Sequence, residues 1–291
     1  MPNIARHFER TQLKDIDLSA QVVTEIGTPV RDVVMAMANA DTSCAFVMDG
    51  SKISGILTEH DVAHRVAQSP DAWDQPVDSF MTPDPFVIDK EASAIEALHI
   101  MRVNKIRNLP VVLDEAGKYA NVTHYDLIVL ASRYLEQQPG EGHSFSAEHV
   151  LRYVDFYGMH SKIPIEVTED TSLAEVIDLM VTRDRGLISV VDDRHVVIGE
   201  FTQHDLFRKV ACRVKDLEDE RVGDWMTTDF ASSLPSATIA EGLHVMAGRR
   251  HRYLVLVNET GRSIGIVTFR DIAEYFEAAF TVPPAAESAP G

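Results

Sequence analysis

Two rhythms of hydrophobic and polar positions alternate along the chain. In residues 94–101 the apolar side chains recur at helical spacing, and an apolar run follows at residues 109–113. Residues 114–117 then predict a turn before a second short strand that ends at Thr123. Apolar positions with a period of about 3.6 residues predict an amphipathic helix, and short apolar runs between turn residues predict buried strands. The pattern therefore predicts an extended leading segment, a helix, two strands and a second helix.

This rhythm occurs four times, which indicates an internal repeat. The other copies have their first strands at residues 46–48, 188–191 and 254–257. In every copy the second strand leads into the motif Thr-x-x-Asp, where x is any residue. The four motifs are Thr58 with Asp61, Thr123 with Asp126, Thr202 with Asp205, and Thr268 with Asp271. The first and third threonines lie 144 residues apart and the second and fourth 145 apart, so a pair of units is duplicated.

We call the copies units one to four. They are predicted at about residues 20–69, 77–135, 160–213 and 222–280. A second landmark supports the duplication, because Met81-Thr82 and Met226-Thr227 each place the methionine 42 residues before the next repeat threonine. The sequence predicts a first pair within residues 1–136 and a second pair within 159–280. A linker and connecting helix at 137–158 and a disordered tail at 281–291 complete the chain.

Composition limits the classes of function. Hydrophobic residues make up 45% of the chain and charged residues 25%, as in folded globular proteins. The formal charge of −18 repels nucleic acid and anionic membrane surfaces. No stretch approaches the roughly 18 apolar residues of a membrane helix, and two cysteines are too few for a disulfide framework. We therefore expect a cytoplasmic protein that binds no nucleic acid and does not insert into membranes.

The four units resemble CBS domains, the repeat named after cystathionine beta-synthase, which pair into Bateman modules. The resemblance rests on the four Thr-x-x-Asp motifs, the two Met-Thr landmarks and the helix-and-strand rhythm, and it covers roughly residues 20–135 and 160–280. It implies an α/β (α+β) fold of tandem CBS repeats, each a small sheet flanked by helices. Paired repeats would pack sheet to sheet about a pseudo-twofold axis and leave two ligand clefts per pair.

The resemblance also implies roles for the motif residues. In family members that bind adenine nucleotides, the motif aspartate commonly accepts hydrogen bonds from the ribose hydroxyls, and the threonine lies near the sugar or phosphate. All eight motif residues are therefore candidate ligand-binding residues. A carboxylate suits a ribose diol, and a helix N-terminus offers N–H groups to phosphate. The same motif also resembles a capping box that starts a helix, and both roles can hold together.

A phosphate ligand needs local positive charge in so acidic a chain. The residue before the motif aspartate is His60, His204 or Arg270 in units one, three and four, but Tyr125 in unit two. Basic residues also precede the first strands, namely Lys105, Arg107, Arg185 and the run 249–252. We add His60, His204, Arg252 and Arg270 to the candidate site. A solvated surface or pairing with nearby acids is the alternative for the basic run.

The four clefts are not expected to be equivalent. Adenine needs an apolar slot, and candidate slots lie in the leading segments at residues 26–29, 81–85, 163–164 and 226–230, although these residues equally suit core and turn positions. Unit two has Ala120 where the other units have glycine, and unit three has Glu200 where units one and four have isoleucine. Glu200 would repel phosphate or help hold a bridging Mg²⁺. Units one and four therefore match a nucleotide cleft best.

The sequence predicts a regulatory protein rather than an enzyme. We find no Gly-x-Ser-x-Gly elbow, no phosphate loop and no His-x-x-x-His with a further acid ligand, and the repeats leave no separate catalytic domain. The predicted function is sensing AMP, ADP or ATP, with or without Mg²⁺ and with no obligatory cofactor, and signalling to a regulated protein whose identity is unknown. A Mg²⁺-responsive module and a structural dimerisation module are the alternatives. The two pairs would form a CBS disc within one chain or across a homodimer.

Overall fold

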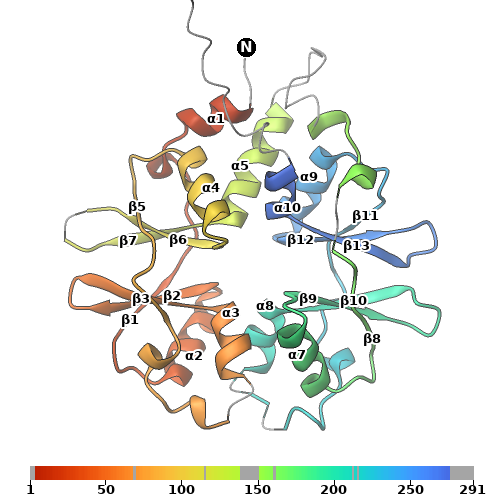
Figure 1. Ribbon diagram of the computed structural model, residues 1–291, viewed down its shortest axis with the longest axis horizontal. Helices are drawn as coiled ribbons and strands as arrows, with labels where there is room; N and C mark the ends of the chain where they lie inside the picture. The colour runs from red at the N-terminus through yellow and green to blue at the C-terminus, as the bar shows by residue number, and fades with distance from the viewer. Residues whose placement is uncertain are drawn as a thin grey trace, which may run out of the picture.

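Four small sheets flanked by helices occupy the four quarters of a flat molecule (Figure 1). The computed structural model describes residues 4–67, 70–114, 116–137, 151–159, 162–211, 213–214 and 216–275, and the structural statements below concern these residues. Units one and two form one half of the molecule, and units three and four form the other. The predicted tail at 281–291 and residues 138–150 of the predicted linker lie outside the described residues.

Each unit has the predicted order of elements, and α1 (Ile4–Arg10) precedes unit one. Unit one contains β1 (Val22–Glu25), α2 (Val30–Ala40), β2 (Cys44–Asp49), β3 (Lys52–Thr58), α3 (Glu59–Asp61) and the helical turn η2 (Val62–Val66). Unit two contains β4 (Thr82–Pro83), β5 (Ile88–Asp89), α4 (Ala94–Val103), β6 (Asn108–Val112), β7 (Tyr119–Thr123) and α5 (His124–Gln137). Unit three contains β8 (Glu166–Thr168), α7 (Leu173–Thr182), β9 (Leu187–Val191), β10 (Val197–Thr202), α8 (Gln203–Asp205) and η6 (Leu206–Val210). Unit four contains β11 (Ser232–Ser233), α9 (Ile239–Arg249), β12 (Tyr253–Val257), β13 (Ser263–Thr268) and α10 (Phe269–Tyr275).

Local sequence determines where the first helices of units two and four begin. The Ser93 hydroxyl accepts a hydrogen bond from the Glu96 N–H, and the Glu96 carboxylate accepts one from the Ser93 N–H at 2.7 Å. Thr238 and Glu241 form the same reciprocal pair at the start of α9. These capping boxes satisfy N–H groups that have no partner inside the helix. The helix predicted from the pattern at residues 94–101 therefore begins at Ala94.

The two units of a pair exchange their leading segments. In every unit the first strand lies between a parallel leading strand and an antiparallel second strand. The outer edge of each second strand pairs with the leading segment of the other unit. Strand β4 of unit two pairs with β3, and single bridges join Ser19 to Asn121, Lys162 to Ile266 and Thr227 to Glu200. The exchange is reciprocal in both pairs, as pseudo-twofold symmetry requires.

The Met-Thr landmarks have a packing role in this exchange. A Cβ atom built on Gly55 would lie 2.2 Å from the Met81 sulfur, and one built on Gly199 would lie 2.6 Å from the Met226 sulfur. Each methionine of one unit therefore lies directly over the backbone of its partner's second strand, where only glycine leaves room. This contact explains why the glycine before Thr-x-x-Asp and the methionine of the partner unit occur together in both pairs.

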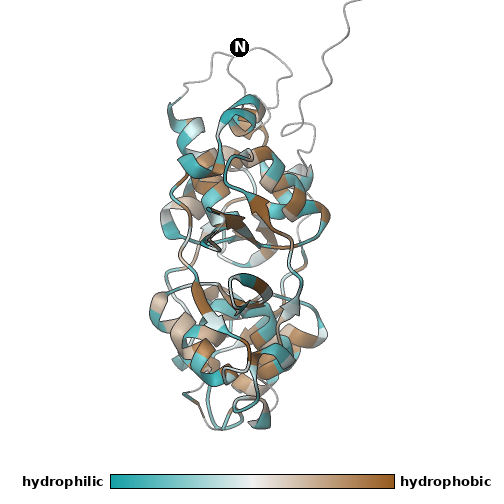
Figure 2. Cartoon of the chain, turned by 90° about the vertical axis from the view of Figure 1, so that its left-hand side faces the viewer, coloured by the Kyte–Doolittle hydropathy of each residue, from teal (hydrophilic) through white to brown (hydrophobic). Residues whose placement is uncertain are grey.

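Apolar faces of the sheets join the two units of each pair. In the second pair, Leu187 and Val197 of unit three form one buried cluster with Val255 and Ile266 of unit four. In the first pair, Phe46 belongs to a buried cluster on the unit-one sheet that Tyr119 of unit two packs against. Figure 2 shows the first pair from its outer side, with one unit above the other. The predicted sheet-to-sheet pairing is confirmed.

Helices join the two pairs into one body. Phe207 of unit three is buried in the core of unit one, and Ala63 of unit one is buried in the core of unit three. In units two and four, α5 packs against α9 within a single apolar cluster. The two pairs thus form an intramolecular disc. In the described part of the chain, no helix combines the length and the hydropathy that crossing a membrane requires.

Candidate functional site

All four Thr-x-x-Asp motifs form the same local structure. In each, the threonine N–H and hydroxyl donate to Oδ2 of the aspartate three residues later, with distances of 2.6–3.0 Å. The aspartate N–H in turn donates to the threonine hydroxyl oxygen. The motif therefore starts a helix, as the capping interpretation requires. Any ligand role is left to the second carboxylate oxygen, Oδ1.

The partners of the second carboxylate oxygen, Oδ1 of the motif aspartate, differ between the four units. Oδ1 of Asp126 accepts a hydrogen bond from Ser19 at 2.7 Å, and Oδ1 of Asp205 accepts one from Thr227 at 2.6 Å. Oδ1 of Asp61 lies 3.6 Å from the Arg65 guanidinium. Oδ1 of Asp271 has no hydrogen-bond partner among the described residues. The leading segments exchanged within each pair therefore occupy the aspartates of units two and three and leave that of unit four open.

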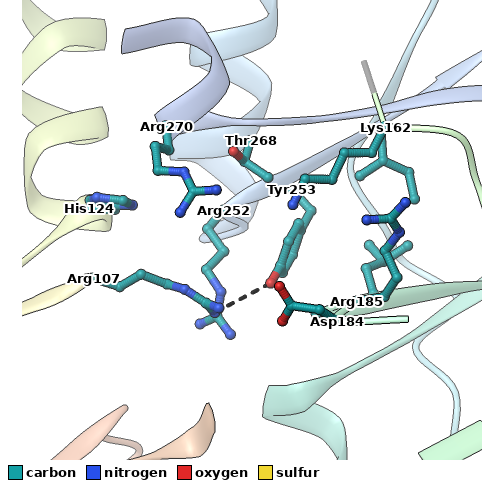
Figure 3. A pocket seen from close by; sticks show the side chains of 12 residues that line it. Arg107, His124, Lys162, Asp184, Arg185, Arg252, Tyr253, Thr268 and Arg270 are labelled. Carbon is teal, nitrogen blue, oxygen red and sulfur yellow. Dashed lines mark hydrogen bonds between the residues drawn. The ribbon is translucent and has the colours of Figure 1, made fainter. Parts of the chain in front are cut away.

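A cleft that opens to solvent lies beside unit four at the centre of the disc, and the space in it that water-sized molecules can occupy is about 90 Å³. Figure 3 shows three arginines on one side of Tyr253 and two more cationic side chains on the other. These five cations are Arg107 of unit two, Lys162 and Arg185 of unit three, and Arg252 and Arg270 of unit four. Asp184 is the only acidic residue among the described residues that line the cleft.

Several of these cations have hydrogen-bond donors to spare. The buried Nε–H groups of Arg185 and Arg252 have no hydrogen-bond partner in the part of the chain that the structure describes. That of Arg270 makes no hydrogen bond there either, but it lies 3.4 Å from the Glu274 carboxylate. Buried donors are almost always satisfied in native proteins, so the unsatisfied donors of Arg185 and Arg252 beside one cleft need an explanation. An anionic ligand that fills the cleft would supply acceptors and negative charge together.

The floor of the cleft depends on one close approach. The Tyr253 hydroxyl lies over Gly186, where an added Cβ atom would come within 1.8 Å of it. Arg107 donates to Gln203 Oε1 at 3.1 Å and to the Tyr253 hydroxyl at 3.4 Å. Burial by itself would raise the pKa of Tyr253, but Arg107 and Arg252 lower it overall. Units two, three and four therefore meet at this tyrosine.

We expect Gly186→Ala to lower the free energy of unfolding by about 1–3 kcal/mol, because the new methyl group displaces the Tyr253 ring. Urea unfolding measures the change. Gly248→Ala is the matched control, since nothing lies within 4 Å of a Cβ atom there and alanine in a helix is favourable by about 0.5–1 kcal/mol. Adding Tyr253→Phe should restore most of the loss. Equal effects of the two glycine substitutions would refute the close approach.

A buried ionic network connects the cleft to units one and three. Arg252 donates to Oε2 of Glu59 at 2.8 Å, and Nδ1 of His204 lies 2.7 Å from Oε1 of the same carboxylate. Burial alone would raise the pKa of Glu59, but Arg252 and then His204 lower it to about 2. Burial alone would lower the pKa of His204, but the nearby Glu59 carboxylate raises it overall. The structure therefore places the candidate residue His204 in a structural ion network, outside the cleft.

Two histidines near the cleft, the buried His124 and the partly buried His60, have lowered pKa values. Burial, followed by Arg107, Arg270 and Arg252, lowers the pKa of His124 to about 3. Burial, followed by the neighbouring His64, lowers the pKa of His60 to about 4. His124 lines the cleft, whereas His60 lies beside the contact with unit three.

The structure brings some predicted residues together and separates others. Thr268, Arg252 and Arg270 line one cleft, but the motif residues of units one to three do not. Asp271 starts the helix next to this cleft without lining it. Glu200 is buried, its Oε1 pairs with His251 at 2.9 Å, and its Oε2 has no hydrogen-bond partner among the described residues.

Sequence reasoning missed Lys162, His124 and Asp184. A signal for His124 exists, because it occupies the position directly after the repeat threonine. The equivalent residues Glu59, Gln203 and Phe269 are also buried where units meet. Lys162 and Asp184 have no such signal, because they belong to connecting segments that only the tertiary fold brings to the cleft.

Comparison with known families identifies all four units. The family model for the CBS domain matches residues 13–68, 77–131, 156–212 and 222–278. The CBS domain-containing protein CBSCBSPB1 of Arabidopsis thaliana is 26% identical, and the match covers 89% of this chain and 52% of that protein. The related CBSCBSPB3 is 27% identical over 94% of this chain and 53% of its own length. The chain thus spans about half the length of the curated relatives it matches.

Solved structures share the whole arrangement. Protein MJ1225 of Methanocaldococcus jannaschii, whose description names it a homolog of g-AMPK, superimposes with a TM-score of 0.71 at 18% identity. That match covers 90% of this chain and 98% of the other. A conserved protein of Pyrococcus horikoshii superimposes with a TM-score of 0.56 at 18% identity, over 91% and 100% of the two chains. At these identities the likeness concerns the fold.

Proposed function

Because this chain belongs to the family of CBS-domain proteins, we propose that it is a regulatory protein that senses an adenine nucleotide in the cleft beside unit four. The single observation that carries the proposal is the charge of that cleft. Five cationic side chains and one acidic side chain line it, in a chain with a formal charge of −18. Such a local reversal favours a ligand with several negative charges, and a nucleotide phosphate chain has them.

Asp271 supports a nucleoside as the rest of the ligand. Its Oδ1 has no partner among the described residues, whereas the equivalent oxygens of Asp126 and Asp205 accept hydrogen bonds from protein hydroxyls. Hydroxyl donors are what a ribose offers. Serine and threonine therefore do in units two and three what a ribose would do in unit four. Lys162 pairs with the strand that leads to Thr268, next to the exposed side chain of Ile163, which is suited to cover a base.

Binding would change contacts between the units. Arg252 reaches into the cleft but holds Glu59 of unit one, so a phosphate competes with that carboxylate. Releasing Glu59 weakens the link to His204 and thus the contact between units one and three. A ligand shifts this equilibrium only by its difference in affinity for the two arrangements. We propose that a regulated protein reads that shift. A cytoplasmic location and signalling as a homodimer belong to the same proposal.

We expect AMP, ADP and ATP to raise the melting temperature, with affinity increasing with the number of phosphates because the cleft is cationic. Ligand at 100 times its dissociation constant stabilises the fold by about 2.7 kcal/mol. Calorimetry should show binding weakened roughly 10- to 100-fold by Arg270→Gln, which removes a charge-assisted contact. Arg249→Gln is the matched control, because Arg249 pairs with Asp229 at the surface, outside the cleft.

Adenosine and Mg²⁺ distinguish the alternatives. Binding of adenosine as tight as that of ATP would contradict the role of the basic cleft. A response to Mg²⁺ alone would favour the Mg²⁺-responsive module. If millimolar nucleotides with and without Mg²⁺ change neither the melting temperature nor the calorimetric heat, the chain is not a nucleotide sensor and a structural module is the better account.

A further inference from the structure

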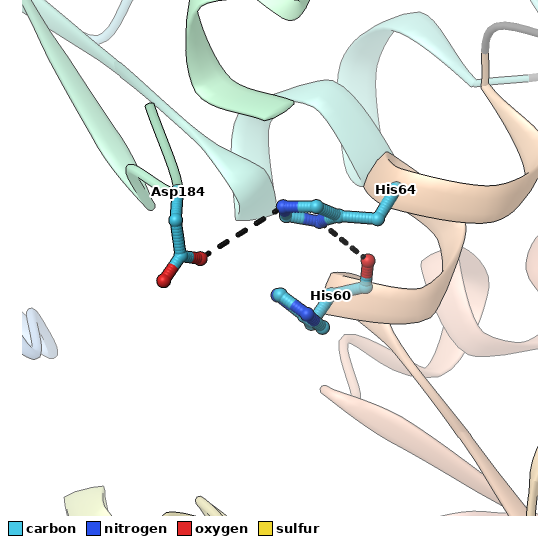
Figure 4. Close-up of side chains that lie close together, drawn as sticks. All are labelled: His60, His64 and Asp184. Atoms are coloured by element: carbon cyan, nitrogen blue, oxygen red, sulfur yellow. Dashed lines mark hydrogen bonds and ion pairs between the residues drawn. The ribbon is translucent and has the colours of Figure 1, made fainter. Parts of the chain in front are cut away.

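Two histidines and an aspartate from opposite halves of the disc lie close together beside the contact of units one and three. His60 and His64 stand one helical turn apart on α3 and η2, with ring centroids 3.9 Å apart. Asp184 follows α7 in unit three and has a left-handed backbone with φ of 47°. One ligand atom from each residue lies within 4.8 Å of the other two. Figure 4 shows the three side chains around a common space at the contact of units one and three.

His64 is oriented as a metal ligand requires. Its Nδ1 lies 3.0 Å from the His60 carbonyl oxygen, which can only accept, so Nδ1 carries the proton and Nε2 carries the free electron pair. That Nε2 is buried, has no hydrogen-bond partner among the described residues, and lies 4.0 Å from Oδ1 of Asp184. In metal sites, a ligating histidine is typically held in this way by a bond from its other nitrogen to a carbonyl.

We propose that His60, His64 and Asp184 form a binding site for a divalent transition-metal ion, with Zn²⁺ as the best fit. Two imidazoles and one carboxylate are a common ligand set for Zn²⁺, with water at the remaining position. Mg²⁺ prefers oxygen ligands and fits poorly. Ligand atoms of a tetrahedral zinc ion lie about 3.3 Å apart, so the side chains must close in slightly. The Asp184 side chain is 89% exposed and free to do so.

The site has a structural consequence that does not depend on the proposed nucleotide. His60 and His64 belong to the first pair of units and Asp184 to the second, so a bound ion links the two halves of the disc. Asp184 also lines the basic cleft, where it is the only acidic residue among those described. A bound cation would therefore neutralise the one negative charge beside the five cations.

The sequence alone does not reveal this site. His60 and His64 form a His-x-x-x-His pair, but the nearest acid in the motif, Asp61, uses Oδ2 to hold Thr58 at the helix start. The acid that completes the set lies 120 residues away in the chain. Only the packing of η2 against α7 brings it near.

Zinc calorimetry on the full chain without an affinity tag tests the proposal. We expect one Zn²⁺ per chain, a higher melting temperature with Zn²⁺, and visible absorption bands of tetrahedral Co²⁺ when cobalt replaces it. His64→Ala should weaken Zn²⁺ binding at least about 100-fold, since losing a ligand costs no less than losing its supporting bond. Asp184→Asn should weaken it as well, and asparagine tolerates the left-handed backbone at this exposed position.

His195→Ala is the matched control, because the chain has twelve histidines and His195 is an exposed one that pairs with Glu166. This variant should bind Zn²⁺ as the parent does. The proposal is wrong if the parent takes up no Zn²⁺ at micromolar concentration. It is also wrong if His64→Ala and Asp184→Asn, folded by circular dichroism, bind Zn²⁺ with the parent's affinity and stoichiometry.

Discussion

Replacing Glu59 with glutamine is expected to lower the free energy of unfolding by about 3 kcal/mol. The Glu59 carboxylate is buried and holds both Arg252 at 2.8 Å and His204 at 2.7 Å. Glutamine keeps the shape but removes the negative charge, so the guanidinium of Arg252 stays largely buried without a counter-ion. Removing one partner of a buried ion pair typically costs about 3–5 kcal/mol, and the partial exposure of Arg252 favours the lower end.

Chemical denaturation of Glu59→Gln, Arg252→Gln and the double variant measures this effect. The double variant should lose less stability than the two single variants together, because it leaves no uncompensated charge. Glu136→Gln is the matched control, since Glu136 contacts His244 at the surface, and its loss should cost less than about 1 kcal/mol. Additive losses in Glu59→Gln and Arg252→Gln would show that the pair makes no cooperative contribution.

Acid is expected to destabilise the protein through His124 well before most carboxylates titrate. Burial, with Arg107 and Arg270, lowers the pKa of His124 to about 3, whereas the unfolded chain has the ordinary value of about 6.5. Between these values the unfolded state binds a proton that the folded state does not. The free energy of unfolding therefore falls as pH drops from about 6.5 toward 3, by roughly 1.4 kcal/mol per pH unit for this group.

Denaturant unfolding at pH values from 7 to 4.5 tests the prediction. His124→Gln should reduce the dependence of the free energy of unfolding on pH by the contribution of about one proton. This holds whatever the substitution does to stability at pH 7. The pKa of His60 is lowered to about 4, so the unfolded chain binds a second extra proton there over much of the same pH range. His60→Gln should therefore also reduce the dependence of the free energy of unfolding on pH. His195→Gln, which removes a histidine at the surface, is the control variant. A parent slope retained in His124→Gln would contradict burial of a neutral histidine.

The repeat pattern predicted the elements closely because each is specified by nearby residues. The helix predicted at residues 94–101 is observed at Ala94–Val103, and the strand predicted at 109–113 is observed at Asn108–Val112. The first strand predicted at 188–191 is observed at Leu187–Val191. Apolar periodicity and capping side chains act over three or four residues, so a single sequence contains them in full.

The candidate site was predicted less completely because its residues come from different units. Thr268, Arg252 and Arg270 belong to one unit and were named together from the sequence. Lys162 and Asp184 reach the cleft from connecting segments of unit three, which no local pattern marks. A cleft formed by several elements depends on how their packed faces are oriented, and residue spacing does not specify that orientation.

The sequence by itself determined four repeats, their pairing and the helix start at every Thr-x-x-Asp motif, because these depend on local periodicity and short-range hydrogen bonds. The tertiary structure decided which motif aspartate stays open. Ser19 and Thr227 reach Asp126 and Asp205 only because paired units exchange their leading segments, while Asp271 has no such neighbour among the described residues. Four motifs that look alike in the sequence are thus made unequal by residues far away in the chain.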